Sequence, residues 1–98
     1  ERVRAALTRM QAACETASVR LAMAVYPYPT RVDLNPYRPI DERALADARE
    51  LGVESLDLLL AFAGERDLSR YQASVFDSHP DGEANRRVAA HLARELWP

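Results

Sequence analysis

Val19-Arg20-Leu21-Ala22-Met23-Ala24-Val25-Tyr26 is the stretch that decides the fold. Its large apolar residues alternate with smaller ones, which is the period of a β-strand. Arg20, near its start, is its one charged residue, so both faces are expected to be covered, as in parallel sheets. Residues 2–17 come before it and carry apolar side chains at helical spacing: Val3, Leu7, Met10, Cys14 and Ala17. A helix that leads into such a strand indicates an α/β protein.

A second helix and strand follow along the chain. Asp41 is a suitable N-cap, and Gly52 suits the position just after the helix. Residues 53–60 then predict a second buried strand, although residues 58–62 could also turn helical. Asp57 is unusual inside such a strand. It could face a cleft at the strand end, or cap or hydrogen-bond a nearby loop.

The segment between these two pairs is rich in proline and tyrosine. Tyr26-Pro27-Tyr28-Pro29 opens an irregular loop that runs to Pro39. Open α/β sheets place their ligands beside loops that leave the carboxyl ends of strands. Tyr28, Arg31 and Tyr37 are therefore candidate substrate-binding residues. The alternative is a stiff crossover whose tyrosines cover the edge of the core.

An acid and an imidazole lie close together in Val75-Phe76-Asp77-Ser78-His79-Pro80-Asp81. Asp77 could bond one ring nitrogen of His79, fix its tautomer and leave the other nitrogen free as a base. Asp81-Gly82 supplies cap and turn chemistry for a last helix over residues 83–97. The alternative is a plain turn with a helix cap. Residues 68–75 are expected to form a short helix or loop, and His91 to be a half-buried packing residue.

Composition narrows the function classes. The 98 residues suit one small domain, 48% hydrophobic and 29% charged, so the chain is neither disordered nor built to span a membrane. A net charge of −2 gives no general reason to bind nucleic acid. Cys14 is the single cysteine, which excludes an internal disulfide and a cysteine metal cluster. We expect it to be a packing residue.

The segment Phe76-Asp77-Ser78-His79-Pro80-Asp81-Gly82-Glu83-Ala84-Asn85-Arg86-Arg87-Val88-Ala89 resembles the closing block of the SGNH/GDSL-type hydrolases. The order of elements across nearly the whole chain is similar to the C-terminal half of that family. The resemblance implies part of a three-layer α/β/α sandwich around a parallel sheet, with a flavodoxin-like arrangement. It also implies ester hydrolysis or acyl transfer, with His79 as general base and Asp77 as the residue that orients it.

Two features depart from that family. Its acid commonly lies three positions before the histidine, where this chain has Phe76. Its nucleophilic serine and oxyanion donors belong to earlier blocks, and none of the serines here stands in such a setting. We therefore expect residues 1–98 to be the C-terminal segment of one hydrolase domain whose nucleophile-bearing part lies elsewhere. Two strands alone would also leave unpaired edges.

The resulting hypothesis is an esterase or O-acyltransferase segment acting on an acyl-ester small molecule or an acylated carbohydrate, without a cofactor. Its expected partner is the missing N-terminal half of the domain or a second copy of the chain. The alternative is a non-catalytic α/β interaction module that pairs through its open sheet edge. A metal site formed by Asp77, His79, Asp81 and His91 has permitted ligand types but no supporting spacing, so no metal is predicted.

Overall fold

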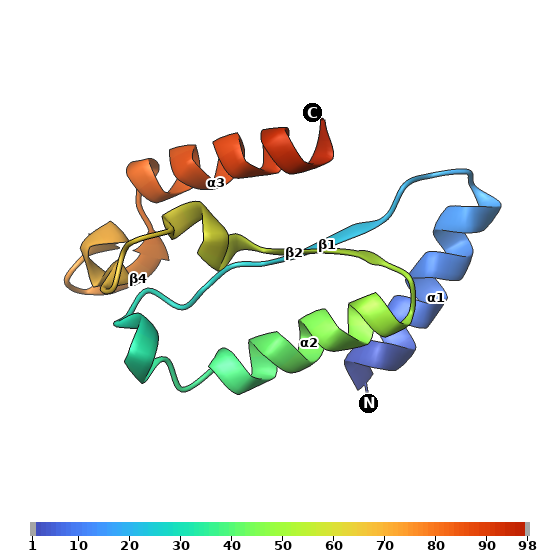
Figure 1. The fold of residues 1–98 in the computed structure, drawn as a ribbon, viewed down its shortest axis with the longest axis horizontal. Helices are drawn as coiled ribbons and strands as arrows, with labels where there is room; N and C mark the ends of the chain where they lie inside the picture. Colours follow the sequence, from blue (N-terminus) through green and yellow to red (C-terminus); the bar gives the residue numbers. More distant parts are fainter. Residues whose placement is uncertain (1, 98) are drawn as a thin grey trace. The chain divides into compact units, whose positions relative to one another are not determined.

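The computed structural model describes residues 2–97 (Figure 1). These residues form two compact units. Unit 1 joins residues 2–25 to Arg38–Asp57, and unit 2 joins Tyr26–Tyr37 to residues 58–97. Each unit is therefore built from two separate parts of the chain. The loop expected over residues 26–39 belongs to unit 2 as far as Tyr37, together with the segment that contains His79, and its last two residues belong to unit 1.

Unit 1 is a small α/β assembly. It contains α1 (Arg2–Thr16), β1 (Ala22–Val25), α2 (Arg38–Glu50) and β2 (Glu54–Asp57). The two strands pair in parallel, from Ala22 opposite Glu54 to Val25 opposite Asp57. The crossover between them includes α2, as parallel pairing requires. The expected mixed α/β class and the parallel pairing are confirmed, at the level of a two-stranded sheet in residues 2–97.

The core of unit 1 forms where its helices meet the sheet. Leu7 of α1, Ala48 of α2 and Val53 are buried together, and three half-buried residues pack on them: Leu21, Met23 and Leu51. The strand is less covered than its sequence predicted, because Ala24 is exposed and the rest of β1 is half-buried. Met10 is also 50% exposed, so only part of the apolar stripe of α1 is in the core.

Both helices of unit 1 end in the same backbone motif. Ser18 (φ 56°) follows α1 and Gly52 (φ 74°) follows α2, each in the left-handed conformation. At the first site Val19 N–H bonds Cys14 C=O at 2.8 Å, and at the second Val53 N–H bonds Ala48 C=O at 2.8 Å. These are Schellman bonds. They confirm Gly52 as the residue that ends the helix.

The expected N-cap of α2 is wrong. The helix begins at Arg38, so Asp41 lies in its first turn rather than before it. Pro39 explains the earlier start, because proline has no N–H to lose and its fixed φ suits the first helical positions.

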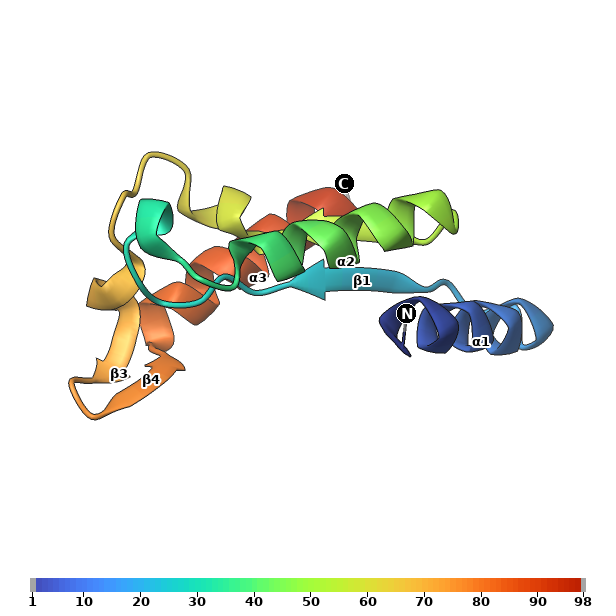
Figure 2. The ribbon, with the colours of Figure 1, turned by 90° about the horizontal axis from the view of Figure 1, so that it is seen from below.

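Unit 2 contains short helical turns, a hairpin and one long helix. The turns are η1 (Val32–Leu34), η2 (Leu58–Phe62) and η3 (Leu68–Tyr71). The hairpin pairs β3 (Gln72–Ser74) with β4 (Asp77–Pro80) in antiparallel orientation, and both strands are visible in Figure 2. The sequence did not predict it, because three or four residues are too few to show strand alternation. The second strand was expected over residues 53–60. In the structure it ends at Asp57, and the chain continues as η2.

The long helix of unit 2 is α3 (Gly82–Leu96). Asp81 is its N-cap and accepts a 2.8 Å bond from Ala84 N–H, as expected. The helix packs against η2, and its buried residues are Ala84, Val88 and His91. His91 is more deeply placed than the expected half-buried position, at 8% exposure.

The two helix ends of unit 1 give a paired stability prediction. Ser18→Gly should raise the free energy of unfolding by about 1 kcal/mol, because glycine removes the left-handed penalty that serine carries. Gly52→Ala should lower it by a similar amount, since the new Cβ meets nothing closer than 3.8 Å and only the backbone conformation is penalised. Urea denaturation followed by circular dichroism measures both. Changes of the same sign in the two variants would contradict this explanation.

Candidate functional site

Asp77 and His79 form a direct pair on β4. The Oδ1 atom of Asp77 lies 2.5 Å from His79 Nδ1 and also accepts the backbone N–H of His79 at 3.0 Å. The two residues are two positions apart on one strand, which places their side chains on the same face. A single carboxylate oxygen thus holds both the backbone and the ring of His79.

The electrostatics of this pair define the state of the ring. The hydrogen bond from the His79 backbone lowers the pKa of Asp77 below its usual value, and the bond from the ring lowers it further. Asp77 is therefore ionised near neutral pH and can only accept hydrogen bonds. The Nδ1 atom must then carry the proton it donates. In the neutral ring this leaves Nε2 with the free lone pair, which is the tautomer a general base needs.

The imidazole faces solvent. Its side chain is 86% exposed, and that of Asp77 is 49% exposed. Ser78 lies between them and points to the opposite face of the strand by alternation. Asp77 is the hydrogen-bond partner of the ring within residues 2–97. The pair is thus oriented, and the solvent-exposed ring leaves room for a further group at Nε2.

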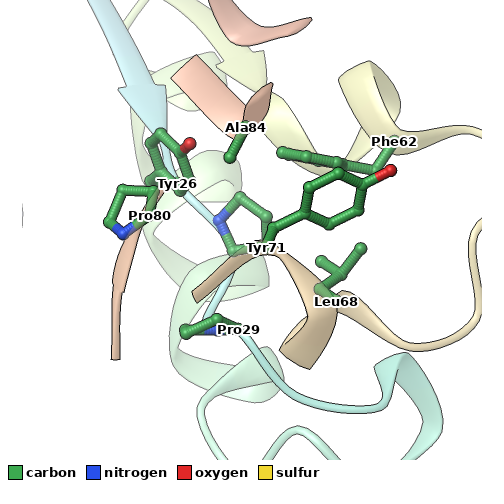
Figure 3. A pocket seen from close by; sticks show the side chains of 8 residues that line it. Tyr26, Pro29, Phe62, Leu68, Tyr71, Pro80 and Ala84 are labelled. Atoms are coloured by element: carbon green, nitrogen blue, oxygen red, sulfur yellow. The ribbon is translucent and has the colours of Figure 1, made fainter. Parts of the chain in front are cut away.

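Pro80, the last residue of β4, lines an aromatic pocket (Figure 3). Pro80 and Ala84 line it together with six further residues: Tyr26, Pro27, Pro29, Phe62, Leu68 and Tyr71. The rings of Phe62 and Tyr71 have centroids 5.2 Å apart, within the range of favourable aromatic pairs. The free space is about 30 Å³, room for little more than one small group. Because His79 does not line it, and because Phe62, Leu68 and Tyr71 are buried, we interpret this pocket as packing within unit 2.

Hydrogen bonds join the hairpin and α3 to the proline-rich loop. Gln72 Nε2 donates to Pro29 C=O at 3.0 Å, and Tyr26 Oη lies 3.4 Å from Asn85 Oδ1. The loop from which the substrate-binding residues were predicted therefore lies beside the segment that contains His79.

The three predicted substrate-binding residues separate into two groups on that loop. Tyr28 and Tyr37 are paired, with ring centroids 5.0 Å apart, and both are exposed. Arg31 instead bonds Asp33 at 2.9 Å and lines a separate hollow of about 380 Å³. The other residues lining it are Val32, Asp33, Glu65 and Arg66. No pattern in the sequence indicated Glu65 and Arg66, because an isolated bridge between Arg31 and Asp67 brings their segment to the loop.

Asp57, unexplained by the sequence, has a structural partner. Arg38 Nη2 donates to Asp57 Oδ2 at 2.6 Å and Nη1 donates to Oδ1 at 3.3 Å. This two-pronged ion pair fastens the start of α2 to the end of β2. The expected bond was to a nearby loop, whereas Arg38 is the first residue of α2, so the bond gives Asp57 a role within unit 1.

Two kinds of feature are absent from residues 2–97. That part of the chain holds no group of three or more histidine, cysteine, aspartate or glutamate residues suited to a metal ion. None of its helices is long and apolar enough to cross a membrane.

No protein-family model, curated protein or solved structure matches this chain. The resemblance to SGNH/GDSL-type hydrolases stays a prediction from the sequence.

The Asp77–His79 contact predicts how the pKa of Asp77 changes when the imidazole is removed. The pKa of Asp77 should lie below that of an ordinary aspartate and should rise in His79→Ala. It should stay below the pKa of an ordinary aspartate, because the backbone N–H of residue 79 still donates a hydrogen bond to Asp77. The stabilisation that Asp77 provides is then present above the ordinary aspartate pKa and lost as pH falls through its lowered pKa. Carboxyl ¹³C NMR measures both values.

Asp67 provides an internal control for that titration. The hydrogen bonds from Ser69 lower its pKa, and His79 has no part in them. Its pKa should therefore be unchanged in His79→Ala. An Asp77 pKa that is the same with and without the imidazole would show that the ring bond does not form in solution.

Proposed function

We propose that this chain supplies the histidine and acid of an SGNH/GDSL-like esterase or O-acyltransferase. His79 acts as general base and Asp77 orients it. The observation that carries the proposal is the 2.5 Å contact between Asp77 and the Nδ1 atom of His79, with the side chain of His79 86% exposed. This arrangement fixes the tautomer and aims the second nitrogen outward, as hydrolase triads require.

The contact between Asp77 and His79 also concerns the position of the acid, which differs from the family pattern. Asp77 lies one position closer to the histidine than the family's usual acid. On a strand, two positions apart is the spacing that puts both side chains on one face. The closer acid is thus compatible with an orienting role, and its lowered pKa keeps it ionised while His79 takes up a proton.

The reaction needs groups beyond this pair. The nucleophilic serine and the oxyanion donors lie outside residues 1–98 in this proposal, on the N-terminal part of the domain or on another chain. The serine attacks an acyl ester while its proton moves to Nε2 of His79. The protonated ring then gives that proton to the leaving alcohol. The deacylating acceptor is water in an esterase and a second alcohol in an acyltransferase.

The proposal extends to the fold, which would be that of the same family. β1 and β2 become two strands of a larger parallel sheet, and the missing part adds strands to complete a three-layer α/β/α sandwich. Support comes from the parallel pairing and from the crossover helix α2 between the two strands.

Ester hydrolysis by the complete protein that contains this chain tests the proposal. His79→Ala should lower kcat by roughly 10²–10⁴-fold, the usual contribution of a positioned acid-base group. Asp77→Asn should lower it less, since the ring loses its orientation but remains present. Burst kinetics with a nitrophenyl ester, with circular dichroism as a folding check, provide the readout.

Ser78→Ala is the matched control, because Ser78 lies between the two residues but faces the other side of the strand. Its activity should equal that of the unchanged protein. Full activity in His79→Ala would remove His79 from the mechanism. Loss of activity in Ser78→Ala would contradict a nucleophile located outside the chain.

A second candidate function is supported by the sheet of unit 1. β1 and β2 each have one partner strand in residues 2–97, so each leaves one edge unpaired. The residues of β1 are Ala-Met-Ala-Val, without the charge or proline that usually protects an edge. A non-catalytic module could pair with a second copy of the chain through this edge, because the edge is unpaired and β1 carries no charge or proline to protect it.

Proline substitution tests edge pairing directly. Successive N–H groups of a strand point to opposite sides, so Ala22→Pro and Met23→Pro affect different sides of β1. One should disrupt the bond to β2, whereas the other should abolish dimerisation and leave the circular dichroism spectrum intact. Light scattering measures the mass. A chain that stays monomeric as its concentration rises would eliminate this candidate.

A further inference from the structure

We infer that a hollow on unit 1 binds a small carboxylate that carries an apolar tail. The hollow lies where the start of α1 meets the first turns of α2, and we call it the Ile40 hollow. Its lining residues are Val3 of α1 and, from α2, Pro39, Ile40, Arg43, Ala44 and Asp47. It belongs to unit 1, whereas the Asp77–His79 pair belongs to unit 2. The inference therefore goes beyond the proposed function and does not rest on it.

The wall of the Ile40 hollow is mostly apolar. Four of its six lining residues have hydrocarbon side chains: Val3, Pro39, Ile40 and Ala44. Ile40 is 65% exposed and Val3 is 49% exposed, although branched apolar side chains are usually buried. The hollow has a volume of about 370 Å³, which falls in the range of small-molecule sites. A hydrocarbon tail in the hollow would remove this apolar surface from water, which is favourable in proportion to the area covered.

Arg43 supplies a positive charge to the same hollow. Its side chain is 69% exposed, and its Nε atom donates to Asp47 Oδ1 at 3.2 Å. Because that bond uses Nε, the two terminal Nη atoms are left without a hydrogen-bond partner in residues 2–97. The paired N–H groups of a guanidinium match the two oxygens of a carboxylate. Arg43 can therefore hold the head group of the ligand while the apolar wall holds its tail.

Asp47 positions that guanidinium. Its side chain is only 7% exposed, and the same Oδ1 atom also accepts a bond of 3.4 Å from Nη1 of Arg4. The buried carboxylate is thus shared between two guanidinium groups. Among the charged residues that line the hollow, Arg43 is the one exposed to solvent. This difference in access favours an anionic ligand over a cationic one.

The balance between the wall and the charge defines the class of ligand. One exposed guanidinium suits a single negative charge, and a ligand with several phosphate groups would find no second exposed cation in the lining. A polar ligand such as a free sugar would leave the apolar side chains uncovered. A monocarboxylate with an aliphatic tail satisfies both parts of the hollow.

Titration of this chain with butanoate, hexanoate and octanoate tests the inference by NMR. Ile40 is the only isoleucine in the sequence, so its methyl signals report directly on the hollow. These signals should shift in a saturable way, with a Kd for octanoate on the order of 1 mM. Each added CH₂ group should tighten binding about three- to fourfold, as expected when the tail leaves water.

Arg43→Gln should weaken the binding of hexanoate and octanoate about tenfold, because the head group loses its guanidinium. It should not change the gain for each CH₂ group, since the apolar wall is intact. Arg49→Gln is the matched control, because Arg49 is exposed on the same helix but does not line the hollow. It should bind both ligands as the unchanged chain does. Circular dichroism checks that the two variants are folded.

Several results would overturn the inference. One is the absence of saturable Ile40 shifts, and another is binding of hexylamine or hexanol as tight as that of hexanoate. Equal shifts at Phe76, which is 98% exposed and does not line the hollow, would show unspecific association of the tail with apolar surface. Ile40 signals that move with protein concentration alone would show that a second copy of the chain covers the hollow. Because no ester is hydrolysed in this test, its outcome is separate from that of the proposed function.

Discussion

One carboxylate oxygen holds the proposed site together. Oδ1 of Asp77 accepts both the backbone N–H and the ring N–H of the same residue, His79. The backbone bond fixes the acid relative to the strand, and the ring bond fixes the imidazole relative to the acid. Because both bonds end on one atom, the orientation of the ring follows from the path of β4. An exposed imidazole would otherwise rotate freely.

The path of β4 depends in turn on the aromatic core of unit 2. Pro80 ends the strand on one side of the packed rings, and Asp81 caps α3 immediately afterwards. The backbone N–H of Asp81 also bonds Tyr71 C=O at 2.7 Å, which joins the end of η3 to the start of α3. The imidazole of His79 is thus held by its neighbours in sequence, which are themselves fixed by the buried residue Tyr71 and the half-buried ring of Pro80.

The sequence predicted the elements whose signals are local and long. The two helices of unit 1, the parallel strands and the last helix all carry repeated apolar positions or clear end residues such as Gly52 and Asp81. The hairpin lacked such a signal, since Val75 and Phe76 are almost fully exposed at its turn and its strands are very short. The start of α2 was misplaced because a good cap residue, Asp41, follows a proline that can itself begin a helix.

The site could be predicted only as far as neighbouring residues determine it. Asp77 and His79 are two positions apart, so their contact could be anticipated from spacing. The hollow lined by Arg31 depends instead on contacts between residues 30–33 and residues 65–68, and no period in the sequence encodes them. For the same reason, the partner of Asp57 could be expected nearby but could not be identified as Arg38.

The two candidate functions differ in what they explain. The unpaired edges of β1 and β2 are expected for a module that dimerises and equally for a domain whose sheet continues on another segment.

The Asp77–His79 pair distinguishes the two candidate functions. Ion pairs between exposed groups contribute little to stability, so folding alone gives little reason for an acid to orient an imidazole on the surface. An interaction module has no use for a fixed tautomer, whereas general-base catalysis requires one. The hydrolase proposal therefore explains both the unpaired sheet edges and the Asp77–His79 pair, whereas the interaction module explains only the edges.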